Sequence, residues 1–209
     1  MPEQMAIAMQ LSFQPPMNGI QVFSGFAAGL RDARKTTGRD QGTGVKIDKG
    51  LHGSWIGTIG YMALLDQIGS CFKPKGVAIV NENTITKALA YFSVLPRPEI
   101  DALYALRCAF AHDYSLYNVN SKNLSLQHQF AVGVGGAMKV VGLPTTPWDG
   151  DYNHKSPINR TIVNLEAFGD LIEGIVTRLI ALAKAQDLEV VLAGGSDELL
   201  DRYSFFTQV

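Results

Sequence analysis

One apolar segment, residues 52 to 72, restricts the folds open to this chain more than any other stretch. It reads HGSWIGTIGYMALLDQIGSCF, and its uncharged part runs from Gly53 to Leu65, where Asp66 interrupts it. A helix needs about 20 apolar residues to cross a bilayer, so this run is too short. The segment therefore predicts a central, buried helix, and we expect no association with a membrane.

Three glycines of this segment fall on one side of the predicted helix. Gly53, Gly57 and Gly60 are spaced at i, i+4 and i+7, which leaves a flat strip that a second helix can approach closely. Such a strip drives dimerisation in lipid. In a water-exposed protein we expect it to serve packing within the chain.

Length and composition favour a single domain that spans residues 1–209. Apolar residues make up 46% of the chain and charged residues 18%, as in ordinary globular proteins. The net charge of −1 provides no global field for a polyanion, so any nucleic-acid site must be local. Two cysteines, Cys71 and Cys108, lie inside apolar segments, and the N-terminus lacks a basic signal region. Both features predict a cytoplasmic protein.

Hydrophobic periodicity predicts four to five helices. We expect a helix from near Asn18 to Arg34, the glycine-rich helix, one that starts at Asn83, one from Pro98 to His112, and a long one from Leu165 to Leu182. The stretch TTGRDQGTG, residues 36 to 44, lacks the Lys-Ser/Thr ending of a phosphate-binding loop and is expected to be a flexible connector. The segment LEVVLAGGSDELL has no secure assignment.

Between the last two of these helices the pattern changes from helical to alternating. Residues 123 to 132, NLSLQHQFAV, alternate in polarity, GVGG follows, and AMKVV suits a second strand. We therefore predict a mainly α fold: an up-and-down helical bundle of four to five helices with a β-hairpin inserted around residues 123–141. Residues 144 to 159 are expected to form a polar loop.

The stretch LRCAFAHDYSLYN, residues 106 to 118, holds the candidate site. Arg107 and His112 interrupt an apolar helix close to its end. The negative end of the helix dipole favours a protonated imidazole by up to about 2 kcal/mol, and a guanidinium offers a planar fork to a phosphate. A proton-exchanging group beside a phosphate clamp is what cleavage of a ribose phosphodiester requires. One imidazole cannot serve as both base and acid in a single step, so the chemistry predicts a two-fold homodimer.

The same residues resemble a known family motif. Arg107-Cys-Ala-Phe-Ala-His112 resembles the Arg-x4-6-His signature of the HEPN superfamily, and Asp113 and Tyr114 extend it to Arg-x4-His-x-Tyr. The resemblance implies a helical bundle and a metal-independent endoribonuclease that acts as a homodimer, with Arg107 and His112 catalytic. It further implies a bacterial toxin or phage-defence component, paired with a nucleotidyltransferase-type antitoxin that transfers AMP to Tyr114.

One position departs from the family pattern and keeps an alternative open. Cys108 follows the motif arginine where active members often carry Asn or Asp. The alternative is a non-catalytic HEPN-like module that binds a nucleotide, RNA or a protein. Asp113, Tyr114 and Cys108 are then positions for substrate contact or modification. In a purely structural reading, Arg107 extends its charge out of the bundle and His112 caps its own helix.

The remaining polar residues suggest no second site. No His, Cys and Asp cluster has metal-ligand spacing, so we expect neither metal nor cofactor. His128 lies on the apolar face of its strand and is expected to be a core histidine. Two further sets are expected to be solvated: Glu166, Asp170 and Glu173 on the long helix, and Lys122, Lys155 and Arg160 around the hairpin. The second set has the alternative of lining a substrate path.

Overall fold

A computed structural model describes residues 1–12, 20–135 and 139–208. Its helices are α1 (Glu3–Leu11), α2 (Gly25–Thr36), α3 (Trp55–Cys71), α4 (Thr84–Phe92), α5 (Arg97–Asp113), α6 (Leu165–Lys184) and α7 (Gly195–Tyr203). Its strands are β1 (Ile20–Ser24), β2 (Phe72–Pro74), β3 (Tyr117–Asn118), β4 (His128–Gly133), β5 (Val141–Gly142), β6 (Arg160–Asn164), β7 (Leu188–Val190) and β8 (Ser204–Gln208). Short 3-10 helices are η1 (Lys49–Leu51), η2 (Leu124–Leu126), η3 (Tyr152–His154) and η4 (Pro157–Asn159).

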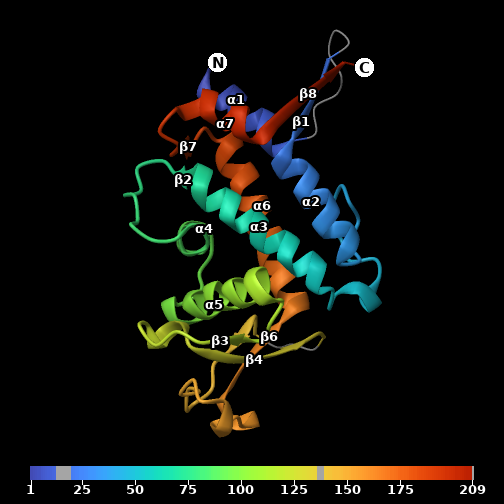
Figure 1. Cartoon of the computed structure of the whole chain (residues 1–209). Coiled ribbons are helices and arrows are strands. Elements are labelled where there is room, and N and C mark those ends of the chain that lie inside the picture. The colour runs from blue at the N-terminus through green and yellow to red at the C-terminus, as the bar shows by residue number, and fades with distance from the viewer. Residues whose placement is uncertain (13–19, 136–138, 209) are drawn as a thin grey trace.

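Helix α3 is the central element, with α2, α4 and α6 packed around it (Figure 1). Its glycines allow the close approach that the sequence predicted. A Cβ atom at Gly57 would collide with Thr37, and one at Gly60 would lie 3.2 Å from the Cβ of Ala33. At Gly69 a Cβ would collide with the carbonyl of Thr84, at the start of α4. The glycine strip therefore serves packing within the chain, as expected.

Side-chain caps fix where the helices begin. Ser24, Ser54, Asn83 and Asn164 each accept a hydrogen bond from a backbone N–H in the first turn of α2, α3, α4 and α6. Such caps stabilise a helix by about 1 kcal/mol each. The cap at Asn83 is the one predicted. Helix α2, in contrast, starts at Gly25 instead of near Asn18, because β1 occupies residues 20–24 and pairs with β8.

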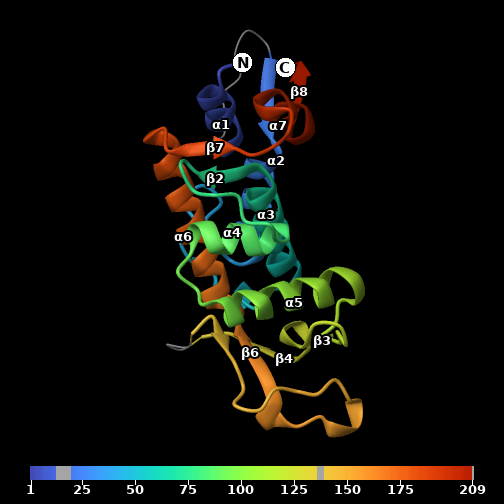
Figure 2. The same cartoon turned by 90° about the vertical axis from the view of Figure 1, so that its left-hand side faces the viewer.

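The four-stranded sheet has the strand order β3-β4-β6-β5 and lies against α5 at one end of the molecule (Figures 1 and 2). Strands β4 and β6 are parallel, whereas β3 and β5 run antiparallel to their neighbours. Two smaller sheets are antiparallel: β1-β8 joins segments near the two ends of the sequence, and β2-β7 joins segments 116 residues apart.

The predicted fold class is wrong in two respects. The described residues form seven helices and three sheets, so the chain is not a four-to-five-helix bundle. The predicted hairpin at 123–141 is also wrong. Residues 128–133 do form a strand, but it pairs in parallel with β6, about 30 residues later. A parallel pair needs a long crossover connection, and the segment between β4 and β6 supplies it.

The physical reason is that the alternation of polar and apolar residues within a strand does not determine which other strand it pairs with. Val141, at the end of the predicted second strand, pairs instead with Val163 in β6. Lys139 and Val140 are not in a strand, and residues 136–138 of the prediction lie outside the described residues. Strand β6 therefore lies between β4 and β5, which would be direct neighbours in a hairpin.

Candidate functional site

Arg107 projects from α5 toward α3 and forms an ion pair there. Its Nε and Nη2 both lie 2.9 Å from Oδ2 of Asp66. The other carboxylate oxygen of Asp66 accepts a hydrogen bond from the hydroxyl of Thr84. Burial alone lowers the pKa of the guanidinium, but the adjacent Asp66 more than compensates and raises it. Arg107 is therefore permanently charged and held in one orientation.

One edge of that guanidinium stays open. The side chain of Arg107 is 32% exposed, and its Nη1 has no hydrogen-bond partner among the described residues. It borders a cavity of about 90 Å³ between α3 and α5, lined otherwise by Ile59, Met62, Ala63, Asp66, Phe110 and Ala111. Asp66 lies directly beside this guanidinium, so an anion at the open edge would meet a cation whose charge is already partly compensated.

His112 lies in the last turn of α5 and is exposed to solvent. It forms no hydrogen bond or ion pair with any residue that the structure describes, and the same holds for exposed Asp113. His112 and Arg107 do not contact one another within the chain. Five helical residues separate them by about 140° around the axis, so one copy of the chain presents the two groups on different sides of the helix end.

Tyr114 ends α5 and is stacked against aromatic neighbours. Its backbone adopts the left-handed conformation with φ of 53°, and its N–H donates to the carbonyl of Phe110 at 3.2 Å. Its ring centroid lies 5.2 Å from that of Trp55 in α3 and 6.1 Å from that of Phe110. Because 48% of Tyr114 is exposed, the residue is anchored by its ring yet accessible.

Cys108 follows Arg107 in α5, and its thiol forms a hydrogen bond with the side chain of Tyr104. It is a free thiol of intermediate exposure, and Cys71, the other cysteine, is buried and also free. Burial and a hydrogen bond with Cys108 raise the pKa of the Tyr104 phenol. Cys108 therefore lies on α5 directly beside the candidate site.

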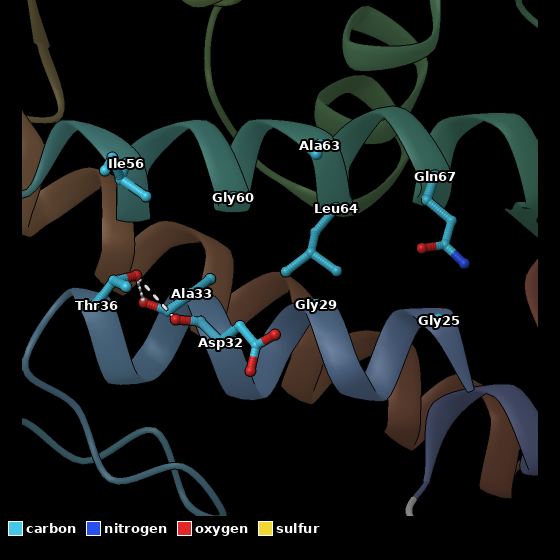
Figure 3. Close-up of a pocket in the computed structure, with 10 residues that line it drawn as sticks. All are labelled: Gly25, Gly29, Asp32, Ala33, Thr36, Ile56, Gly60, Ala63, Leu64 and Gln67. Carbon is cyan, nitrogen blue, oxygen red and sulfur yellow. Dashed lines mark hydrogen bonds between the residues drawn. The ribbon is translucent and has the colours of Figure 1, made fainter. Parts of the chain in front are cut away.

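A second hollow lies on the neighbouring side of α3, against α2 (Figure 3). Its volume is about 280 Å³, and it is lined by Gly25, Gly29, Asp32, Ala33, Thr36, Ile56, Gly60, Ala63, Leu64 and Gln67. Ile56 stands at its edge with 67% of its surface exposed. Ala63 borders both hollows. The outer side of α3 is therefore an uncovered apolar ridge between two depressions.

The sequence prediction missed a group of buried charges between α2 and α6. Arg34 is only 7% exposed, and its Nη2 lies 2.7 Å from Oε2 of Glu173. The hydroxyl of Tyr61 donates to the same carboxylate at 2.8 Å. Arg34 also donates to the carbonyls of Gln41 and Gly42, at 3.0 and 2.8 Å. These contacts hold residues 37–44 against α6.

A second set of ion pairs joins the same loop to α6 closer to the start of that helix. Arg39, 4% exposed, pairs with Asp170 at 2.8 Å, and Lys46 binds both Asp170 and Glu166 at 2.7 Å. The Nδ1 of buried His52 lies 2.8 Å from the carbonyl oxygen of Thr37, whereas its Nε2, 4.0 Å from Glu166, has no hydrogen-bond partner among the described residues. The prediction of a flexible connector is therefore wrong, and so is that of solvated carboxylates for Glu166 and Glu173, whereas Asp170 is exposed as predicted but paired. Each arginine has a partner far away in sequence, which residue spacing does not reveal.

Two of the remaining predictions concern histidine and metals. His128 is partly buried, with its Nδ1 2.8 Å from the hydroxyl of Thr161 and its Nε2 3.0 Å from the carbonyl of Ser125. Burial lowers its pKa. It is thus a satisfied core histidine, as expected. Within the described ranges, no three His, Cys, Asp or Glu side chains converge in a way that could hold a metal ion.

Fold and site together define a mostly helical protein with three small sheets, in which a four-stranded mixed sheet lies against a helix that carries one fixed cation and, at its end, one exposed imidazole. Comparison with protein-family models, curated proteins and solved structures finds no match for this chain. Among the described residues, no helix has both the length and the apolarity needed to cross a membrane.

Proposed function

We propose that this protein is a metal-independent endoribonuclease of the HEPN type, active as a cytoplasmic homodimer, with Arg107 and His112 as its catalytic residues. The observation that carries the proposal is the contrast between these two side chains. Asp66 fixes Arg107 with one guanidinium edge open, whereas exposed His112 has no partner among the described residues. A fixed cation suits a phosphate, and a free imidazole suits proton transfer.

In the proposed reaction, His112 of one copy removes the proton of a ribose 2′-hydroxyl, and the oxygen attacks the adjacent phosphorus. His112 of the second copy gives a proton to the departing 5′-oxygen. Arg107 stabilises the charge that develops on the phosphate oxygens. The products are a 2′,3′-cyclic phosphate and a 5′-hydroxyl. Two copies are required because one imidazole cannot occupy both positions.

The ridge of α3 is the surface that we assign to the homodimer. It borders the Arg107 cavity through Ala63, so a second copy seated there would lie beside the guanidinium. Exposed Ile56 provides an apolar side chain, and the hollow against α2 can receive such a side chain from the other copy. An isologous pair of this kind buries both ridges at once.

The biological role that follows is a bacterial toxin or phage-defence component. In that role a nucleotidyltransferase-type antitoxin would silence the enzyme by transferring AMP to Tyr114. The half-exposed position of Tyr114 at the end of α5 is compatible with such a transfer.

The test is cleavage of RNA in the presence of EDTA. We expect wild type to release 2′,3′-cyclic phosphate ends and His112→Ala to lose at least about 100-fold in rate, the usual contribution of one acid–base group. His112 forms no hydrogen bond or ion pair with a described residue, so this variant should fold, which circular dichroism verifies. Lys184→Ala, which removes another exposed side chain in the last turn of a helix, is the matched control. Intact RNA with wild type, under every substrate tried, contradicts the assignment.

The homodimer has its own test within the same design. Ile56→Glu places a charge on the α3 ridge, and we expect it to give a monomer in sedimentation equilibrium and to lose cleavage. Ile79→Glu is the matched control, since Ile79 is 68% exposed. A wild-type monomer that still cleaves RNA excludes the composite site.

A non-catalytic RNA-binding module is the second candidate, and the Arg107–Asp66 ion pair favours it. Asp66 already neutralises much of the charge that a phosphate would need. Titration of labelled RNA with wild type, without turnover over hours, would support this candidate over the nuclease.

A further inference from the structure

The outer face of the four-stranded sheet carries one row of three unlike side chains. Tyr117 in β3 pairs with Gln129 in β4, and Gln129 pairs with Arg160 in β6. Residues paired in register point to the same face of a sheet, and adjacent strands lie about 4.8 Å apart. An aromatic ring, a carboxamide and a guanidinium thus follow one another over about 10 Å.

This row lines a hollow in the sheet surface. The hollow has a volume of about 330 Å³ and is bordered by Leu116, Tyr117, Gln129, Phe130, Ala131, Val132 and Arg160. Such a volume is at the lower end of small-ligand sites, about 300 to 1,000 Å³. The hollow is large enough for one flat ring system.

One polar atom beside the hollow, the Oε1 of Gln129, lacks a hydrogen-bond partner among the described residues. The side chain of Gln129 is only 1% exposed. A buried acceptor without a partner is costly, so a stable protein retains one mainly where something else satisfies it. A donor on a bound ring would satisfy this one after a small movement of the side chain.

An aromatic cluster adjoins the row. The ring centroids of Tyr117, Trp148 and Tyr152 lie 5.3 to 5.6 Å apart in pairs. Trp148 is buried beneath the cluster, whereas Tyr152 is 52% exposed. Lys155 lies with its Nζ 5.8 Å from the centre of the Tyr152 ring. The face therefore offers the exposed ring of Tyr152 with Lys155 beside it, and the half-buried ring of Tyr117.

The charge of this region differs in sign from that of the whole chain. Residues 114 to 164 contain four cations and two carboxylates, although the chain has a net charge of −1. The cations Lys122, Lys155 and Arg160 are exposed and form no ion pair with any described residue. One carboxylate, Asp149, is already bound to His154 at 2.6 Å. A polyanion would thus meet a local positive surface.

We infer that this sheet face is a platform for single-stranded RNA, in which bases stack on Tyr117 and Tyr152 while Arg160 and Lys155 contact the phosphates. Unpaired bases offer rings for stacking, which a duplex hides. The inference rests on the proposed function, because it assigns the substrate-binding surface of the same nuclease. Only five residues separate His112 from Tyr117, so at most about 18 Å lies between their Cα atoms.

The experiment measures binding of a labelled 12-nucleotide oligouridylate to the full chain carrying His112→Ala, so that cleavage does not interfere. We expect Tyr152→Ala to weaken binding by about 5- to 100-fold, the usual effect of losing one stacked base. We expect Lys155→Gln with Arg160→Gln to lower the slope of log Kd against log salt by about 1.4, or 0.7 per phosphate contact.

Lys35→Gln with Lys184→Gln is the matched control, since both are exposed lysines without an ion pair among the described residues. Equal losses in the control and the sheet variants overturn the inference, as does equal affinity for a 12-base-pair duplex. Absence of oligouridylate binding overturns it too. If the sheet variants weaken binding while wild type cleaves nothing, the platform stands and the nuclease proposal fails. If His112 is required for cleavage but the sheet variants bind normally, only the platform fails.

Discussion

The cations around α6 and those around the four-stranded sheet are of the same chemical kind but have opposite surroundings. Arg34 and Arg39 are less than 10% exposed, and each faces a carboxylate on α6. Lys155 and Arg160 are exposed and face no carboxylate among the described residues. A charge that has a buried partner maintains the fold, whereas an unpartnered one remains available to another molecule. Arg107, half-exposed and paired on one edge only, combines both conditions.

The largest effect is expected from removal of Arg34. Arg34→Met leaves the Glu173 carboxylate without its cation in a nearly buried position. Loss of one partner from a buried pair costs about 3–5 kcal/mol of unfolding free energy, measurable by urea denaturation. Arg178→Met, at an exposed arginine on α6, should cost less than about 0.5 kcal/mol. Equal stability of the two variants would contradict the distinction between buried, paired cations and exposed ones.

A double variant sharpens this result. Arg34→Met with Glu173→Leu removes both charges and should regain much of the stability that the single change loses, because two apolar side chains can replace a buried pair. No recovery would indicate that the contacts of Arg34 with the carbonyls of Gln41 and Gly42 matter more than its ion pair.

The next effect is a dependence of stability on pH. A hydrogen bond from Lys46 lowers the pKa of Glu166 below its ordinary 4.5. Burial raises the pKa of Asp170, but bonds from Lys46 and Arg39 outweigh it and leave a net decrease below 3.8. Carboxylates with lowered folded-state pKa values stabilise the fold above their ordinary values, and the contribution is lost as pH falls through the folded-state values.

Lys46→Met should therefore lower stability near neutral pH by about 0.5–1 kcal/mol, a small value because the pair is partly exposed and screened. The difference from wild type should shrink as the pH decreases from about 5 to 3. Thermal melts over this range measure it. A constant difference at every pH would mean that Lys46 contributes packing and not charge.

The smallest effect is expected at the sheet. Lys155→Gln with Arg160→Gln removes two exposed cations that pair with no described residue, so the unfolding free energy should change by less than about 0.5 kcal/mol. The same urea titration measures it. A loss of 2 kcal/mol or more would place these cations with the structural ones around α6 and would weaken the case for an RNA platform.

Local features of the structure were largely predictable. The polarity pattern located α3, α4, α5 and α6 to within a few residues, because helical periodicity and cap residues act over short distances. It also located β4. Helices α1 and α7 were not predicted. Nor were strands β1, β2, β3, β6, β7 and β8, since two- to five-residue strands bear little pattern of their own. The role of Arg107 and His112 as a nuclease site stays a prediction.

The sequence by itself determined the positions of α3, α4, α5 and α6, the close approach of Gly57 and Gly60 to the end of α2, and that one helix ends in Arg107, His112 and Tyr114. The tertiary structure alone decided which strand lies beside β4, which carboxylate neutralises each arginine, and which cations remain free. The physical reason is distance along the chain. A helix is held by bonds between residues four apart, whereas Arg34 and Glu173 are 139 residues apart and meet only after the helices have packed.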